Sequence, residues 1–147
     1  MVVAADTSFL FSLYGNDDNT EKAIRWVKEH SQVLTLSVLN EFEFANALRF
    51  AEFKSFLSPG KAEEVLDEFF EDKKQGRVVI ASCNLSQVTQ EAMRLSSKRT
   101  RVGGHRSFDI LHVASAVQVR AEKFLTFDRN QASLARHAGL QVPDGFV

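Results

Sequence analysis

Short apolar runs alternate with longer helical patterns along the chain. The runs fit buried strands at Val2–Ala5, Val33–Leu36, Val78–Ala81 and Lys123–Phe127, with Leu140–Val142 as a candidate fifth. The segments between them are long enough for helices, which are the crossovers that parallel strands need. The alternation therefore predicts an α/β fold around a mostly parallel sheet of four to five strands.

Six helices are expected in the remaining sequence. Capping residues, helical periodicity and terminal glycines place them at about Glu21–His30, Ser37–Phe56, Ser58–Lys74, Ser86–Lys98, Asp109–Ala121 and Asn130–His137. The helix that begins at Asp109 is apolar on nearly every side, so it is expected to be buried. The segment Arg99–Ser107 is polar and contains glycine, and it is predicted to be a loop.

Size and composition limit the classes of protein that the chain can represent. With 147 residues and neither linker nor repeat, residues 1–147 are expected to form one domain. The single Cys83 allows no internal disulfide. There is no secretory leader and no long apolar run, so a cytoplasmic location away from the membrane is expected. A balance of 18 basic against 19 acidic side chains excludes a strongly basic protein that coats nucleic acid.

Several acidic side chains are expected to meet at one edge of the sheet. Asp6 follows the first strand and Asp128 the fourth, while Glu41 and Glu43 fall in the first turns after the second. Asp109 begins the buried helix, where the helix dipole stabilises a carboxylate. Ligands of such folds bind at the carboxyl ends of the strands.

Carboxylates that converge raise one another's pKa unless a cation lies between them. Hard oxygen donors without a Cys or His pair favour Mg²⁺ or Mn²⁺ over zinc. Such an ion activates water and stabilises charge on a phosphoryl oxygen, so the pattern favours phosphodiester hydrolysis.

Other interpretations of the same residues remain open. A lone aspartate after a strand commonly caps a helix, and Asp109 alone could be an ordinary first-turn acid. His112 is expected to be a packed, hydrogen-bonded side chain. A phosphoacceptor regulatory domain also has acids at strand ends, but it expects an adjacent acid pair where this chain has Asp6, Thr7 and Ser8.

Four segments together carry a resemblance to a known family. They are Ala5–Phe9, Glu43–Arg49, Ser107–Ala116 and Leu125–Arg129, and they occur in family order over nearly the whole chain. The sequence resembles PIN-domain ribonucleases of the VapC type, the toxin half of bacterial and archaeal toxin–antitoxin pairs. The resemblance implies an α/β/α sandwich, Mg²⁺- or Mn²⁺-dependent endoribonuclease activity on RNA, a homodimer, and a small antitoxin protein that covers the acidic site. A silent PIN-like module that only binds RNA or protein is the alternative within the family.

The acidic positions of the family match four residues, which are Asp6, Glu43, Asp109 and Asp128. The match implies that Asp6, Asp109 and Asp128 hold the metal and that Glu43 orients or deprotonates the attacking water. Glu43 is favoured over Glu41 because it directly precedes the matching Phe-Ala-Asn-Ala-Leu-Arg segment.

Two smaller features accompany this match. Ser8 and Thr126 are expected to support the acids through their hydroxyl groups. Asn130 lies near the position where some relatives carry a further acid. The number of metal ions in the site, one or two, therefore stays open.

Basic and aromatic residues suggest two further surfaces. Arg99, Arg101 and Arg106 lead towards Asp109 and are expected to contact the RNA backbone, unless they are simply solvated surface. Seven phenylalanines lie on two successive helices, and they are Phe42, Phe44, Phe50, Phe53, Phe56, Phe69 and Phe70. The phenylalanines spread over a wider angle than one core-facing stripe of a helix. The two helices should therefore pack together as a protruding hairpin or leave an apolar groove for a partner.

Overall fold

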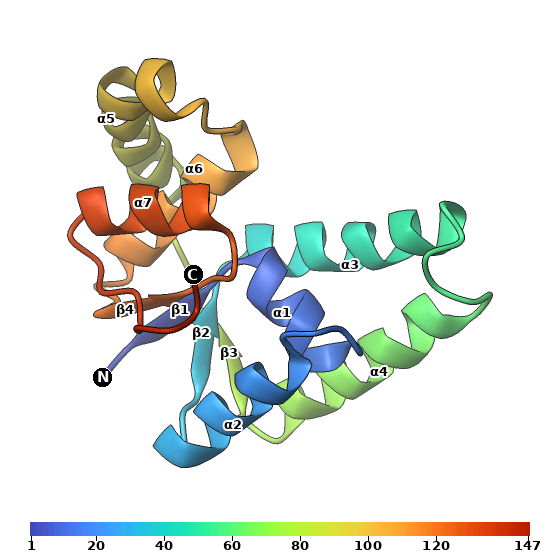
Figure 1. The fold of residues 1–147 in the computed structure, drawn as a ribbon. Helices are drawn as coiled ribbons and strands as arrows, with labels where there is room; N and C mark the ends of the chain where they lie inside the picture. The colour runs from blue at the N-terminus through green and yellow to red at the C-terminus, as the bar shows by residue number, and fades with distance from the viewer.

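Four parallel strands form the only sheet, in the order β3-β2-β1-β4 (Figure 1). The computed structural model describes residues 1–147 and places β1 at Val3–Ala5, β2 at Leu34–Leu36, β3 at Val78–Ile80 and β4 at Lys123–Leu125. The chain runs outwards from β1 to β2 and β3 and then returns to place β4 on the other side of β1. The strand order therefore reverses at β1 and β4, and such a reversal is where α/β folds bind ligands.

The candidate fifth strand at Leu140–Val142 does not form. Gln141 makes one isolated parallel bridge to Lys123, in which the Gln141 amide donates to the Glu122 carbonyl oxygen. The next amide on that side of the segment would belong to Pro143, which has no N–H to donate. The pairing therefore stops after one bridge.

Seven helices cover the two faces of the sheet (Figure 1). They are α1 (Thr7–Tyr14), α2 (Thr20–His30), α3 (Val38–Phe53), α4 (Lys61–Lys74), α5 (Leu85–Gly103), α6 (Ser107–Gln118) and α7 (Arg129–His137). Helices α1 to α4 lie on one face and α5 to α7 on the other, as the predicted α/β/α sandwich requires. None of them combines the length and apolarity needed to span a membrane.

Each face of the sheet has its own hydrophobic core. Successive side chains of a strand point to opposite faces, so Val3 and Ala5 join the core beneath α1 to α4, whereas Ala4 joins the core beneath α5 to α7. In β4, Leu125 and Phe124 divide in the same way. Because both faces are covered, the ends of the strands are the parts of the sheet left for a polar site.

Two helical predictions were wrong. The helix at Thr7–Tyr14 was not among the six expected, yet the segment forms α1 and buries Phe9 and Leu10. The predicted loop Arg99–Ser107 is largely helical, since α5 continues to Gly103. Gly104 then ends α5 in the left-handed conformation, with φ of 64°, which glycine adopts without strain.

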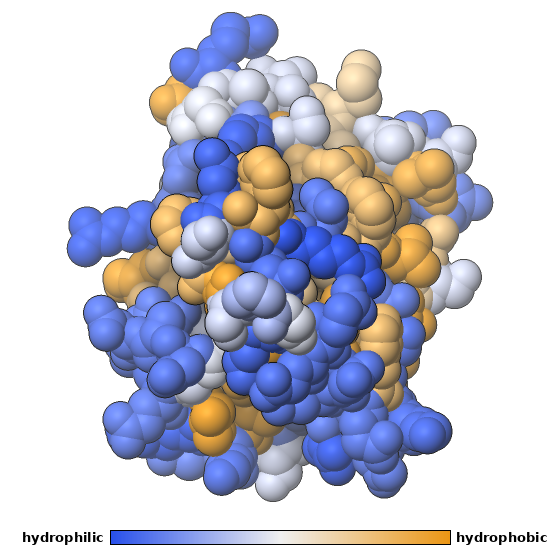
Figure 2. All heavy atoms as spheres, turned by 90° about the vertical axis from the view of Figure 1, so that its right-hand side faces the viewer, coloured by the Kyte–Doolittle hydropathy of each residue, from blue (hydrophilic) through white to orange (hydrophobic).

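The predicted hairpin of α3 and α4 is confirmed. The two helices pack against each other through Phe44 and Leu48 of α3 and Leu66 and Phe69 of α4, and the pair projects beyond the sheet (Figure 1). The other phenylalanines of the hairpin are exposed. They are Phe42, Phe50, Phe53 and Phe70 on the helices and Phe56, which was expected in the first helix but lies in the turn after it. On the face that carries the tip of the hairpin, apolar patches lie between hydrophilic side chains (Figure 2).

Phe44→Ala should lower the free energy of unfolding by about 3–5 kcal/mol, because the ring is fully buried against Tyr14 and Phe69. Phe53→Ala is the matched control on the same helix. Its side chain is 78% exposed, so its loss should change the stability by no more than about 0.5 kcal/mol. Urea unfolding of the two variants measures both values, and equal losses would contradict the packing described.

Candidate active site

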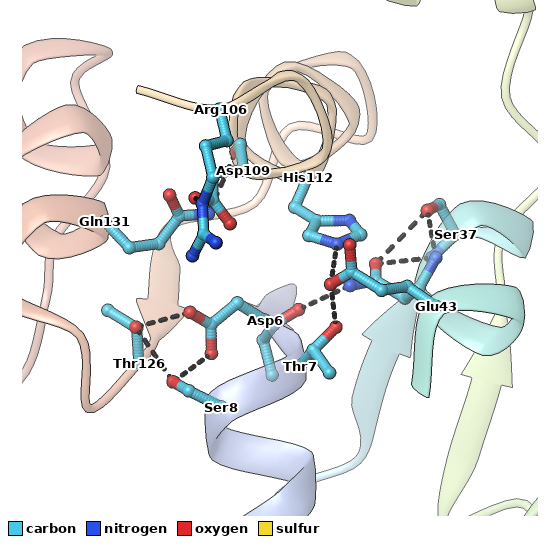
Figure 3. Close-up of polar contacts among 12 residues, drawn as sticks. Asp6, Thr7, Ser8, Ser37, Glu43, Arg106, Asp109, His112, Thr126 and Gln131 are labelled. Atoms are coloured by element: carbon cyan, nitrogen blue, oxygen red, sulfur yellow. Dashed lines mark hydrogen bonds and ion pairs between the residues drawn. The ribbon is translucent and has the colours of Figure 1, made fainter. Parts of the chain in front are cut away.

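Asp6 lies at the carboxyl end of β1 and caps the N-terminus of α1. Its Oδ1 accepts hydrogen bonds from the Phe9 amide (3.0 Å) and from the Ser8 hydroxyl (2.7 Å). Its Oδ2 accepts a hydrogen bond from the Thr126 hydroxyl (2.5 Å), which follows β4. Figure 3 shows Ser8 and Thr126 on the same side of the carboxylate. Both hydroxyls that the sequence singled out therefore hold Asp6.

Burial governs the electrostatics of Asp6. The residue is 4% exposed, and loss of hydration raises the pKa of its carboxyl from 3.8 to about 6. The hydrogen bonds from Thr126, Phe9 and Ser8 offset only part of this effect. An ionised Asp6 is thus an under-compensated negative charge, which a cation would stabilise.

Glu43 lies in the second turn of α3, whose start is fixed to the end of β1. The side chains of Ser37 and Asn40 form a capping box, and the side-chain Nδ2 of Asn40 also donates to the carbonyl oxygen of Ala5 (3.1 Å). The Oε1 atom of Glu43 accepts hydrogen bonds from the hydroxyl of Thr7 (2.5 Å) and from Nε2 of His112 (2.9 Å). Partial burial raises the pKa of Glu43, but these two hydrogen bonds outweigh it, so the pKa lies below its usual value.

Glu41, the alternative that the residues alone left open, turns away from this site. Its Oε2 forms an ion pair with Nζ of Lys73 on α4, at 2.5 Å. The structure therefore places Glu43, and not Glu41, beside the other acids.

Asp109 lies in the first turn of α6 and faces the same region from the other layer. Its pKa is raised, first by partial burial and then by the negative charges of Glu43 and Asp128, while Arg106 lowers it. The Arg106 Nε lies 3.6 Å from Oδ2 of Asp109, and its guanidinium points into the space between Asp109 and Asp6 (Figure 3).

Asp128 lies at the margin of this group and caps α7. Its Oδ1 accepts a hydrogen bond from the Gln131 amide (2.8 Å), and its side chain is exposed. The buried Gln131 side chain also donates to the carbonyl oxygen of Asp109 (2.9 Å). Gln131 therefore sets the position of α7, and of Asp128, relative to the start of α6.

The donor chemistry of this region fits a hydrated divalent ion. No three His, Cys, Asp or Glu side chains are close enough to enclose a metal by themselves. Mg²⁺, however, usually keeps several waters and binds through one or two carboxylates. Asp6 and Asp109 offer such oxygens, and burial raises the pKa of both carboxyl groups. A groove of about 410 Å³ leads to the site, lined by Glu43, Ala47, Arg106, Ser107, Phe108 and Asp109.

The three arginines that the sequence grouped together occupy different places. Arg106 borders the acids, as described. Arg101 lies exposed on α5 and donates to the carbonyl oxygen of Ser97 in its own helix. Arg99 is half-buried on the same helix, and its Nε has no hydrogen-bond partner. The structure brings only Arg106 to the groove, because α5 continues where a loop was expected.

Three residues of the site were not assigned a role there from the sequence: Thr7, His112 and Gln131. His112 is the packed, hydrogen-bonded histidine that was expected, but its partner is Glu43. Its position three residues after Asp109 on one helix was the available signal. Thr7 and Gln131 gave none, because their partners are 36 and 22 residues away in the sequence.

The chain matches one known protein family over most of its length. The model of the PIN domain matches residues 3–137. The chain belongs to the PIN domain family. PIN domains are in general nucleases. No curated protein sequence matches this chain at a significant level.

Solved PIN structures share the fold at low sequence identity. The structure of FitAcB from Neisseria gonorrhoeae is 19% identical with a TM-score of 0.64, and the match covers 96% of each chain. VapBC2 from Rickettsia felis, bound to a DNA fragment from their promoter, is 14% identical with a TM-score of 0.68, and the match covers 97% of this chain and 98% of that one. These likenesses confirm the predicted α/β/α fold.

Asp6→Asn should stabilise the metal-free protein at neutral pH. The unfolded carboxyl ionises near pH 3.8 and the folded one near pH 6, so the folded state binds the proton more tightly and loses stability as the pH rises through this window. A shift of about two pKa units corresponds to about 3 kcal/mol in the free energy of unfolding. The variant should be more stable than the wild type by this amount above pH 6 and should show no such gain below pH 4.

Urea unfolding in EDTA between pH 4 and pH 8 measures this difference. Asp67→Asn, a change of an exposed acid on α4, is the control and should show no such gain. A variant that is no more stable than the wild type at pH 7.5 would show that Asp6 is not an under-compensated charge.

Proposed function

We propose that this PIN domain is a metal-dependent endoribonuclease and the toxin of a toxin–antitoxin pair. The observation that carries the proposal is the buried, under-compensated Asp6 at the end of β1, beside a groove that Glu43 and Asp109 line. This is the arrangement of oxygen donors and open space that hydrolysis of a phosphodiester requires. The family supports nuclease activity, while RNA as substrate and Mg²⁺ or Mn²⁺ as cofactor are part of the proposal.

Asp6 and Asp109 hold the ion in this scheme, and Asp128 holds it directly or through water. Mg²⁺ or Mn²⁺, when bound, supplies an activated water and stabilises charge on the phosphoryl oxygens. Ser8 and Thr126 fix both oxygens of Asp6. Thr7 and His112 fix Oε1 of Glu43, so Oε2, which has no protein donor, can accept a hydrogen bond from the attacking water.

The residue next to Asp6 disfavours the phosphoacceptor alternative, which expects an adjacent acid pair after the first strand. The residue that follows Asp6 is Thr7, which hydrogen-bonds Glu43 and is not a second acid.

A protein partner belongs to the proposal as well. Exposed phenylalanines on α3 and in the turn after it, among them Phe42, Phe53 and Phe56, leave apolar surface that a homodimer contact or an antitoxin segment would cover. The likeness to FitAcB and VapBC2 supports an antitoxin partner. An antitoxin that reaches the groove would cover Asp109 and Glu43 and so inhibit cleavage.

Cleavage of RNA should require Mg²⁺ or Mn²⁺ and stop in EDTA. Asp109→Asn and Asp6→Ala should each lower the rate by about 100- to 1,000-fold, the usual cost of removing one group that stabilises charge in the transition state. Asp67→Asn should cleave at the wild-type rate. Gel analysis of labelled RNA measures these rates, and RNA that is bound but never cut would favour the silent binding module.

Arg106→Gln should weaken RNA binding and reduce the salt dependence of the affinity by about one charge, because the guanidinium borders the groove. Arg101→Gln should have a smaller effect, and Arg25→Gln on α2 should have none. Fluorescence anisotropy in EDTA over a salt series measures binding without cleavage. Equal losses in all three variants would indicate general charge attraction and no specific role for Arg106.

A further inference from the structure

His112 is the most deeply buried ionisable side chain in contact with the site, and it is 2% exposed. Its Nε2 lies 2.9 Å from Oε1 of Glu43, the same oxygen to which Thr7 donates. Figure 3 shows the ring of His112 and the hydroxyl of Thr7 approaching this carboxylate from opposite sides. His112 and Thr7 therefore hold Glu43 by one oxygen. Their two hydrogen bonds restrict rotation of the carboxylate about the bond that joins it to the side chain.

The far side of the His112 ring has its own polar environment. Nδ1 of His112 and Oγ of Ser115 are both buried, and neither has a hydrogen-bond partner in the protein. The two residues are three positions apart on α6, so they share one face of the helix. Both line a cavity of about 10 Å³, together with Ser37 and Asn40. This is room for one water, and the lining supplies the polar partners that a buried water needs.

We propose that His112 is a positioning residue for Glu43, and this rests on the proposed function. A neutral ring donates Nε2–H to Oε1 of Glu43, while Nδ1 accepts a hydrogen bond from a water that is also bound to Ser115. The water fixes the tautomer, as a hydrogen bond to one ring nitrogen commonly does for the other. With Oε1 held, Oε2 faces the groove and orients the attacking water.

Two substitutions separate this role from packing. His112→Phe keeps a planar ring but removes the donor, and it should lower kcat by about 10- to 100-fold with KM changed less than about twofold. His112→Gln places an amide donor near the position of Nε2 and should restore kcat to within about fivefold of the wild type. Equal losses of kcat in the two variants, or none in His112→Phe, would overturn the proposal.

A double-mutant cycle tests whether His112 acts through Glu43. In a Glu43→Gln background, adding His112→Phe should cost less than about twofold in kcat, because the contact that it removes no longer positions a carboxylate. Losses that multiply across the two sites would show that the residues act independently and would overturn the proposal.

A spectroscopic measurement gives a result that does not depend on turnover. The ¹⁵N and ¹H shifts of the imidazole groups at neutral pH, with His112→Gln to assign the signal, should show His112 protonated at Nε2 and bare at Nδ1. The opposite tautomer would overturn the proposal. If the wild-type protein shows the expected tautomer but cuts no RNA, the proposed function fails on its own, whereas an active protein with equal losses in both variants overturns only the role of His112.

Discussion

The carboxylate of Asp6 is buried at the end of β1, one of the two inner strands of the sheet, and three donors offset only part of the hydration that it loses. That placement decides much of the surrounding structure. Ser8 from α1 and Thr126 from the end of β4 meet because both donate to it. Burying the ionised carboxylate destabilises the folded protein. A cation bound beside Asp6 would offset this cost, which favours cation binding at the site.

Neighbouring carboxylates are tuned in opposite directions. Burial raises the pKa of Asp6 and of Asp109, whereas hydrogen bonds from His112 and Thr7 lower the pKa of Glu43. Groups of the same chemical type can take different roles when their environments separate their pKa values. Asp6 and Asp109 are the groups that a bound cation would stabilise. Glu43, whose lowered pKa favours the ionised form, is the group that can accept a hydrogen bond from a water.

The near-neutral charge of the chain conceals an uneven distribution. Asp6, Glu43 and Asp109 gather at one edge of the sheet, and Arg106 stands among them. Arg106 is exposed at the start of α6, whereas strands and helix ends fix the acids. The net value of −1 is thus a sum over a negative site and its basic margin.

The sequence by itself determined the α/β architecture and placed Asp6, Asp109 and Asp128 beside strand ends or at a helix start, because strand length, helical period and the residues that follow strands are local signals. It missed α1, which buries Phe9 and Leu10, and it ended α5 at about Lys98 although the helix continues to Gly103. Only the resemblance separated Glu41 from Glu43, because the two residues lie two positions apart on α3 and their partners are distant in the chain. Only the tertiary structure decided that Glu41 forms an ion pair with Lys73 and that Glu43 forms a hydrogen bond with His112, because those contacts join side chains that are distant in the chain.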